Sequence, residues 1–166
     1  TKGDPRHVLA VDASLVAHGS HWFVRETTGF LRRTLARLDV SSRTLFALVE
    51  EGSCFAGTLL EVALAADRIY MQRLPDATAR EPALMPSALN FGAYPMVNGR
   101  SRLARRFCDD AAEIAAVAAC IDTALPPARA DALGLVTAMP DDIDWNDEIR
   151  IALEELLNAL TRELAA

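Results

Sequence analysis

The sequence lacks an excess of basic residues, a long apolar run and a recognisable targeting segment. The net charge is −6 and the isoelectric point is near 5.0, which argues against a general nucleic-acid binder because such proteins are usually basic. No apolar run approaches the roughly 20 residues of a membrane-spanning helix. The first residues, Thr-Lys-Gly-Asp-Pro, resemble no signal peptide. We therefore expect a cytoplasmic protein that binds neither nucleic acid nor membrane.

Cysteine is also scarce, and its spacing suits neither a metal site nor a disulfide framework. The three cysteines are Cys54, Cys108 and Cys120, an odd number without the short paired spacing of a zinc site. We expect reduced thiols and no metal. Cys54 lies in the most informative turn of the chain, so a chemical role for its thiol stays open as the less favoured alternative.

The residues that are present describe a folded globular chain. Its 166 residues are 51% apolar and 24% charged, a balance that allows one domain to bury a core. We expect a single domain over residues 1–166, with a C-terminal helix over residues 146–165.

Strand patterns and helix patterns alternate along the chain. Strands are expected over 7–13, 45–49, 68–72 and 135–138, and helices over 20–38, 57–66, 100–107, 109–123, 128–133 and from 144 onward. Residues 74–86 carry Pro, Asp and Glu and are expected to form a loop. Alternating strands and helices predict the α/β class.

Residues 45–67 carry the strongest indication of chemistry. A buried strand ends at the small residues 52–57 and is followed by an Ala/Leu-rich helix. The first N–H groups of such a helix have no partner within the helix and can bind an anion or a developing oxyanion. Glu61 lies one turn into this helix. The pattern therefore predicts a site that polarises a carbonyl, with an acid/base group beside it.

The same residues resemble the crotonase (enoyl-CoA hydratase/isomerase) superfamily. The resemblance rests on three motifs in the family's order, Ala56–Asp67, Tyr94–Leu103 and Pro127–Val136. It implies an α/β fold of the crotonase-like (ClpP/crotonase) ββα spiral type, from which the first strands are missing. An incomplete sheet has an exposed strand edge. The resemblance therefore implies a partial domain that forms a homo-oligomer or is completed by another crotonase-like segment.

The resemblance also implies where a substrate would bind. The backbone N–H of Thr58 would hold a thioester oxygen, and the opposite donor would be Val11, with Ala13 as an alternative. Gly57, Asn90 and Arg100 are the further candidates for contacts with substrate or coenzyme A. Coenzyme A would enter as part of the substrate, and no separate cofactor is implied.

Glu61 corresponds to one of two carboxylates that hydratases use for proton transfer. The alternative interpretation is a first-turn glutamate that stabilises the helix N-terminus. The second family glutamate has no counterpart, because Ala88 or Leu89 stands where it is expected. Asn90 could orient water there, but an amide cannot carry a proton through the same cycle.

Two interpretations of other polar residues also stay open. Arg100 and its neighbours form a basic cluster at a helix start, where arginines either bind phosphates or form ion pairs within the protein. Asp12 either orients the strand that carries the first oxyanion donor or acts as a turn or cap residue.

Within the superfamily, residues 21–27, 31–46, 90–97 and 141–145 resemble the carboxy-terminal half of the benzoyl-CoA-dihydrodiol lyase family. This resemblance implies ring cleavage of a benzoyl-CoA dihydrodiol or epoxide with release of formate. The alternative is a catalytically degenerate crotonase-like scaffold or oligomerisation module. In that case the apolar face of the final helix would be the docking element.

Overall fold

The computed structural model describes residues 1–75 and 81–164, so part of the loop expected over 74–86 lies outside the described residues. The helices are α1 Pro5–Ala17, α2 Trp22–Ala36, α3 Gly57–Leu64, α4 Arg102–Arg106, α5 Ala111–Ala118, α6 Pro127–Ala132 and α7 Trp145–Leu164. The strands are β1 Phe46–Val49 and β2 Arg68–Met71, and the 3-10 helices are η1 Leu38–Val40 and η2 Ala88–Phe91. Within these described ranges, no helix has the length and apolarity needed to cross a membrane.

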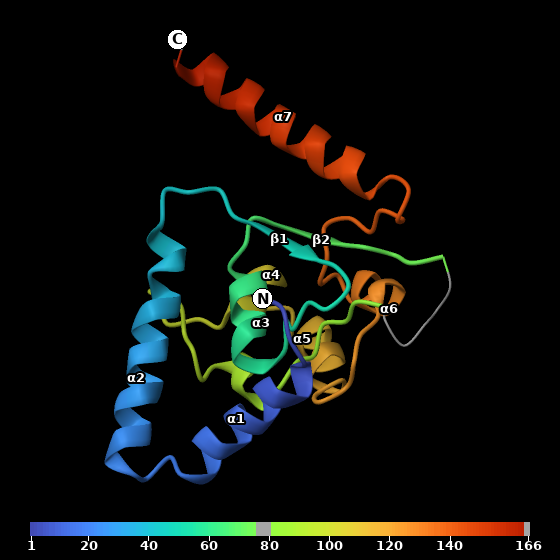
Figure 1. The fold of residues 1–166 in the computed structure, drawn as a ribbon. Helices are drawn as coiled ribbons and strands as arrows, with labels where there is room; N and C mark the ends of the chain where they lie inside the picture. The colour runs from blue at the N-terminus through green and yellow to red at the C-terminus, as the bar shows by residue number, and fades with distance from the viewer. Residues whose placement is uncertain (76–80, 165–166) are drawn as a thin grey trace.

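A parallel pair of strands forms the centre of the fold (Figure 1). β1 and β2 are joined by α3, the usual way to connect parallel neighbours. Ala47 pairs with Ile69 and Val49 pairs with Met71. All four side chains are buried in the main core together with Leu60, Ala63 and Leu64 of α3. This face of the sheet therefore fixes α3, and with it the turn that carries the predicted site.

The opposite face of the sheet packs against the beginning of α7. Tyr70, Trp145 and Ala152 form a second, smaller core, against which Phe46 also packs. Figure 1 shows α7 on one side of the sheet and the remaining helices on the other. The layers are therefore α7, the two-stranded sheet, and the α3 core.

Most elements expected from the sequence are confirmed. The strands over 45–49 and 68–72 correspond to β1 and β2, and the helices over 20–38 and 57–66 correspond to α2 and α3. Each of these segments has a clear apolar pattern and a turn at its ends. The α/β class is confirmed as a mixed α/β structure with a small parallel sheet.

The strand expected over 7–13 is wrong, because these residues belong to α1. The Asp4 side chain accepts the backbone N–H of Arg6 and Pro5 occupies the first turn, both of which favour a helix start. The more buried residues, Val8, Asp12 and Leu15, then recur at helical spacing on one face. The short apolar run His7–Ala13 resembles a strand, although the buried residues follow the period of a helix.

The strand expected over 135–138 is also wrong. Only one residue of it forms a bridge, Ala138 with Tyr70. The backbone N–H of Met71 donates to the carbonyl of Ala138 at 3.1 Å. This segment therefore runs along the outer edge of β2 without becoming a third strand.

Candidate functional site

The strand–turn–helix unit forms as expected and has a glycine at its critical position. Gly57 has a φ of +44°, a conformation that glycine adopts without steric cost. Its N–H donates to the carbonyl of Met85 at 2.9 Å. The chain can then turn into α3, with the N–H of Thr58 directed out of the helix start.

The side chain of Asp12 occupies the position in front of this helix start. The N–H of Thr58 donates to Asp12 Oδ2 at 2.7 Å, and the Thr58 hydroxyl donates to Oδ1 at 2.6 Å. A carboxylate is the type of group that a helix N-terminus favours. The anion position expected from the sequence is therefore filled by an anion of the same chain.

Asp12 is almost fully enclosed, with 4% of its surface exposed. Burial raises the pKa of its carboxyl, because a charged carboxylate is poorly solvated there, while the two hydrogen bonds from Thr58 act in the opposite direction. Among the ion pairs of the described residues, none includes Asp12. Its negative charge is thus held by hydrogen bonds from an uncharged residue.

The Tyr94 phenol extends this group of polar side chains. Its hydroxyl lies 2.9 Å from the hydroxyl of Thr58. Burial raises the pKa of the phenol, and the nearby Asp12 and Glu61 carboxylates add to the rise. Tyr94 therefore stays a neutral hydrogen-bond partner and connects Thr58 to the neighbouring cavity.

Val11 does not occupy the position expected for the second donor. It lies in the middle of α1, where a backbone N–H donates to the carbonyl four residues earlier. Its side chain is 58% exposed. Because residues 7–13 form a helix and not a strand, the structural reason for placing the Val11 N–H opposite Thr58 is lost.

Glu61 lies in a closed network of buried polar groups, with 1% of its surface exposed. One carboxylate oxygen accepts a hydrogen bond from Asn90 at 2.8 Å, and the other accepts one from Arg102 at 2.7 Å. Burial raises the pKa of this carboxyl, and the hydrogen bonds from Asn90 and Arg102 counteract the rise. The arrangement is that of a structural ion pair.

Asn90 is fully engaged in the same network. Its amide nitrogen donates to the carbonyl of Gly57 at 2.9 Å as well as to Glu61, and its oxygen accepts the N–H of Ser87 at 2.8 Å. Asn90 therefore ties the turn at Gly57 to η2. In this arrangement it presents no free hydrogen-bonding group to a ligand.

Arg102 is the centre of the buried network. Its guanidinium also contacts the carboxylate of Asp39 at 3.0 Å, and both side chains are almost fully buried. One cation thus lies between two carboxylates, Glu61 and Asp39. The interpretation of this basic cluster as internal ion-pair partners fits Arg102.

Arg100 also forms an ion pair, here with Asp109 at the surface. Its guanidinium donates in addition to the carbonyl of Ala104 at 3.2 Å. Arg100 lies outside the Asp12 and Glu61 groups, so the described structure does not bring it next to Thr58.

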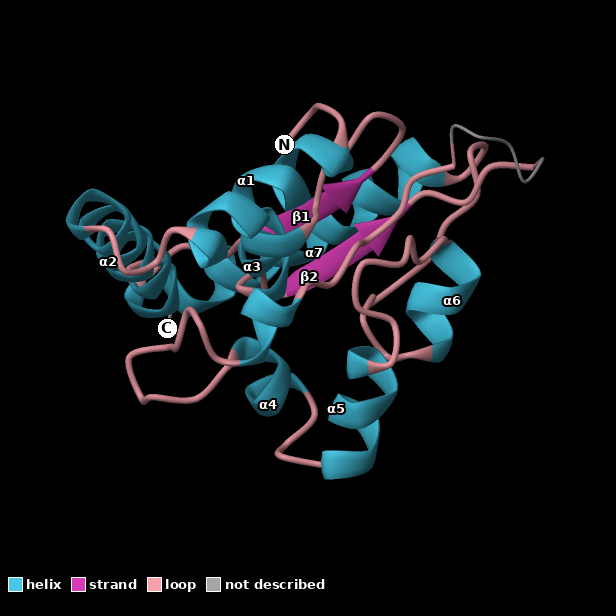
Figure 2. Ribbon diagram, turned by 90° about the horizontal axis from the view of Figure 1, so that it is seen from below, coloured by secondary structure: helices cyan, strands magenta, loops and turns pink. Residues whose placement is uncertain are grey.

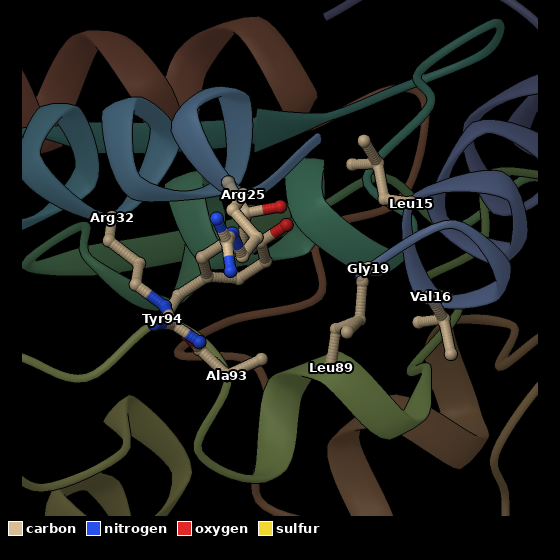
Figure 3. A pocket seen from close by; sticks show the side chains of 9 residues that line it. Leu15, Val16, Gly19, Arg25, Arg32, Leu89, Ala93 and Tyr94 are labelled. Atoms are coloured by element: carbon tan, nitrogen blue, oxygen red, sulfur yellow. The ribbon is translucent and has the colours of Figure 1, made fainter. Parts of the chain in front are cut away.

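Two cavities flank Asp12 and Tyr94. The first, of about 340 Å³, lies between α1, α2 and η2 and includes Arg25, Arg32 and Tyr94 in its lining (Figure 3). The second, of about 550 Å³, lies between α1 and η2 and includes Asp12 in its mostly apolar lining. Leu89 lines both. The polar group at the start of α3 is therefore adjacent to space for a small ligand.

Sequence reasoning missed Tyr94 and Asp39 as members of these groups. Tyr94 precedes Pro95 in a segment whose pattern predicts an ordinary turn. Asp39 follows a helix whose pattern predicts a solvent-exposed face. Nothing in their local pattern indicates burial. The helical spacing of Asp12 with Val8 and Leu15 was the one signal that could have placed Asp12 beside α3.

Within residues 1–75 and 81–164, no group of three or more His, Cys, Asp or Glu side chains is arranged to hold a metal ion. The three cysteines are unpaired, and Cys54 and Cys120 are buried.

Comparison with known proteins gives one informative similarity. No protein-family model matches the chain. Benzoyl-CoA-dihydrodiol lyase from Aromatoleum evansii is 59% identical over 155 residues, which is 93% of this chain and 27% of that enzyme. The chain thus spans about a quarter of the length of this relative. Over nearly all of its own length, the chain is similar to a segment of benzoyl-CoA-dihydrodiol lyase.

Proposed function

We propose that the chain is an acyl-CoA-handling part of an enzyme that acts as the benzoyl-CoA-dihydrodiol lyase does. In this proposal it adopts a crotonase-like fold, and the complete enzyme opens the ring of a benzoyl-CoA dihydrodiol or epoxide. The product is an aldehyde-bearing acyl-CoA, and formate is released. The enzyme is cytoplasmic.

The observation that carries this proposal is the 59% identity over 155 residues to the lyase. Two structural features support it. The helix start at Thr58 favours an oxygen anion, and the cavities beside it have apolar walls. A thioester carbonyl at the end of an aromatic acyl group needs such a combination.

In the proposed site the N–H of Thr58 binds the thioester oxygen and Gly57 allows the close approach. Arg25 and Arg32 lie at the cavity between α1 and α2, where they suit an anionic part of the ligand (Figure 3). Glu61 is assigned a supporting role in this proposal, because both of its oxygens are occupied by Asn90 and Arg102.

A second candidate is a catalytically degenerate scaffold that supports the rest of a longer enzyme. The closure of Glu61 in a buried ion pair and the occupation of the Thr58 N–H by Asp12 favour this reading. Both candidates share the same fold and differ in whether the cavity accepts an acyl-CoA.

Titration calorimetry with benzoyl-CoA separates the two candidates. If the acyl-CoA proposal holds, the wild-type chain binds benzoyl-CoA saturably and Leu89→Trp, which fills space in both cavities, weakens binding at least tenfold. Ile143→Trp, at an exposed position before α7 and outside both cavities, is the matched control and keeps wild-type affinity. Absence of saturable binding by the wild-type chain supports the scaffold instead.

In either case the chain has a protein partner, which is a second copy or another crotonase-like segment. Two surfaces suit such a partner. The first is the apolar face of α7, where Leu153, Leu157 and Leu160 are exposed. The second is the side of β1 that faces away from β2.

A further inference from the structure

We propose that Asp12 is a displaceable internal ligand, which closes the α3 helix start until a substrate oxygen takes its place. The inference rests on the proposed function, since it concerns the thioester oxygen that would bind to Thr58. It assigns to α1 a role in deciding which ligands reach the site.

Asp12 satisfies the donors that an incoming oxygen would need. Both its oxygens are held by Thr58, one by the backbone N–H and the other by the hydroxyl. A charge-assisted hydrogen bond is roughly twice as strong as a neutral one. A neutral thioester oxygen must therefore compete with a carboxylate for the same N–H, and ligand affinity is lowered by this competition.

The turn is shaped around the Asp12 carboxylate. A Cβ atom on Gly57 would lie 1.9 Å from Asp12 Oδ2, far inside any allowed contact. Glycine at this position thus has two roles, because it allows the positive φ of the turn and its lack of a Cβ leaves room for the carboxylate. It makes the space in which the carboxylate sits.

Asp12 differs from the other buried carboxylate, Glu61, in how it is held. Glu61 is paired with the buried guanidinium of Arg102, so its removal from that position would break a buried ion pair and leave Arg102 with Asp39 as its one carboxylate partner among the described residues. Asp12 has no ion pair among the described residues, and its departure leaves only the donors of Thr58, which the ligand oxygen then satisfies. Of the two carboxylates, Asp12 is therefore the one that a ligand can replace.

The structure also has room for the displaced side chain. Asp12 itself lines the cavity of about 550 Å³ between α1 and η2. A rotation of its side chain toward this cavity would move the carboxylate away from Thr58 without unfolding α1. Displacement then requires a rotamer change at one residue.

Chemical rescue tests whether a free carboxylate can take the place of Asp12. Asp12→Ala removes the internal ligand and leaves a site of carboxylate size in front of Thr58. We expect sodium acetate, but not sodium chloride at equal ionic strength, to raise the melting temperature of Asp12→Ala and to shift the Thr58 amide signal in NMR spectra. Asp142→Ala, at an exposed loop aspartate, should show neither effect.

Calorimetry with benzoyl-CoA then tests competition. We expect Asp12→Asn, which keeps the shape and removes the charge, to bind benzoyl-CoA roughly tenfold more tightly than wild type. Asp142→Asn removes an exposed carboxylate from a loop outside the lining of both cavities and should keep wild-type affinity. If Asp12→Asn fails to fold, Asp12→Ala serves as the second variant, since it also removes the competing carboxylate and should also bind benzoyl-CoA more tightly than wild type.

The outcomes separate this inference from the proposed function. Acetate rescue without any benzoyl-CoA binding supports the internal ligand and rejects the acyl-CoA proposal. Binding of benzoyl-CoA that is equal in wild type, Asp12→Asn and Asp142→Asn keeps the acyl-CoA proposal and overturns the internal ligand. Absence of both rescue and binding overturns both.

Discussion

Asp12 and Glu61 are both buried carboxylates, but their surroundings differ. Glu61 has a cation and an amide as partners, whereas Asp12 has only the donors of Thr58. Burial raises the pKa of both groups. Local environment, and not residue type, therefore decides which carboxylate is fixed and which can respond to a ligand or to pH.

The raised pKa of Asp12 makes stability depend on pH. A carboxyl whose pKa is higher in the folded state binds more protons when the protein is folded. Its contribution to the stability of the folded state is therefore fully present below its usual pKa near 4, and this stability is lost as the pH rises through the raised pKa. We expect the melting temperature of wild type to fall relative to that of Asp12→Asn between about pH 4 and pH 7. Thermal melts of both proteins across this range measure the difference.

The reference for this comparison is Asp142→Asn, which changes an exposed side chain. Its melting temperature should run parallel to that of wild type across the same pH range. A wild-type protein that gains stability over Asp12→Asn as the pH rises would mean that the Thr58 hydrogen bonds outweigh burial.

Arg102 gives a second test at the residue scale. Arg102→Leu leaves the carboxylates of Glu61 and Asp39 buried without their cation, and breaking a buried pair in this way costs about 3–5 kcal/mol. Arg100→Leu removes an arginine whose ion pair with Asp109 is largely exposed, which costs at most about 1 kcal/mol. Urea denaturation measures both losses, and equal losses would show that the buried network contributes no more than a surface pair.

At the scale of elements, the sequence predicted those parts of the fold that have a clear local period. β1, α3 and β2 follow from an apolar run, small turn residues and an Ala/Leu helix. The prediction of a strand in place of α1 is wrong because His7–Ala13 is a short apolar run that resembles a strand, whereas Asp4 and Pro5 start a helix. Thr58 lies at the start of α3, where the local pattern predicts it. Asp12 and Tyr94 reach Thr58 from distant segments, and a local pattern does not predict such contacts.

α7 is the element whose exposed surface most needs an explanation. Its first turns pack through Trp145 and Ala152, but Leu153, Leu157 and Leu160 remain exposed. We expect Leu157→Glu to change the free energy of unfolding by no more than about 0.5 kcal/mol. The same substitution should abolish self-association in sedimentation velocity runs. Glu154→Gln, a polar change on the same helix, is the control and should leave self-association unchanged. If the Leu157→Glu protein still associates, α7 is not part of the interface.

At the scale of the whole molecule, the central sheet is narrow for a chain of this length. The two strands run in parallel (Figure 2), and parallel sheets are usually covered on both faces and extended by further strands. Residues 137–141 follow the outer side of β2 through the bridges of Ala138 and Asp141. Among the bridges of the described residues, none joins the outer side of β1.

The open side of β1 has a consequence for amide exchange. Because successive residues of a strand alternate in direction, and the carbonyl of Val49 accepts from Gln72 on the β2 side, the amides of Phe46 and Leu48 point away from β2. In the isolated chain these two amides should exchange with deuterium faster than those of Ala47 and Val49. Equal protection of all four would show that the edge is already covered. Slower exchange at Phe46 and Leu48 in the presence of the proposed partner would show strand addition, so these two amide rates report whether another polypeptide continues the sheet.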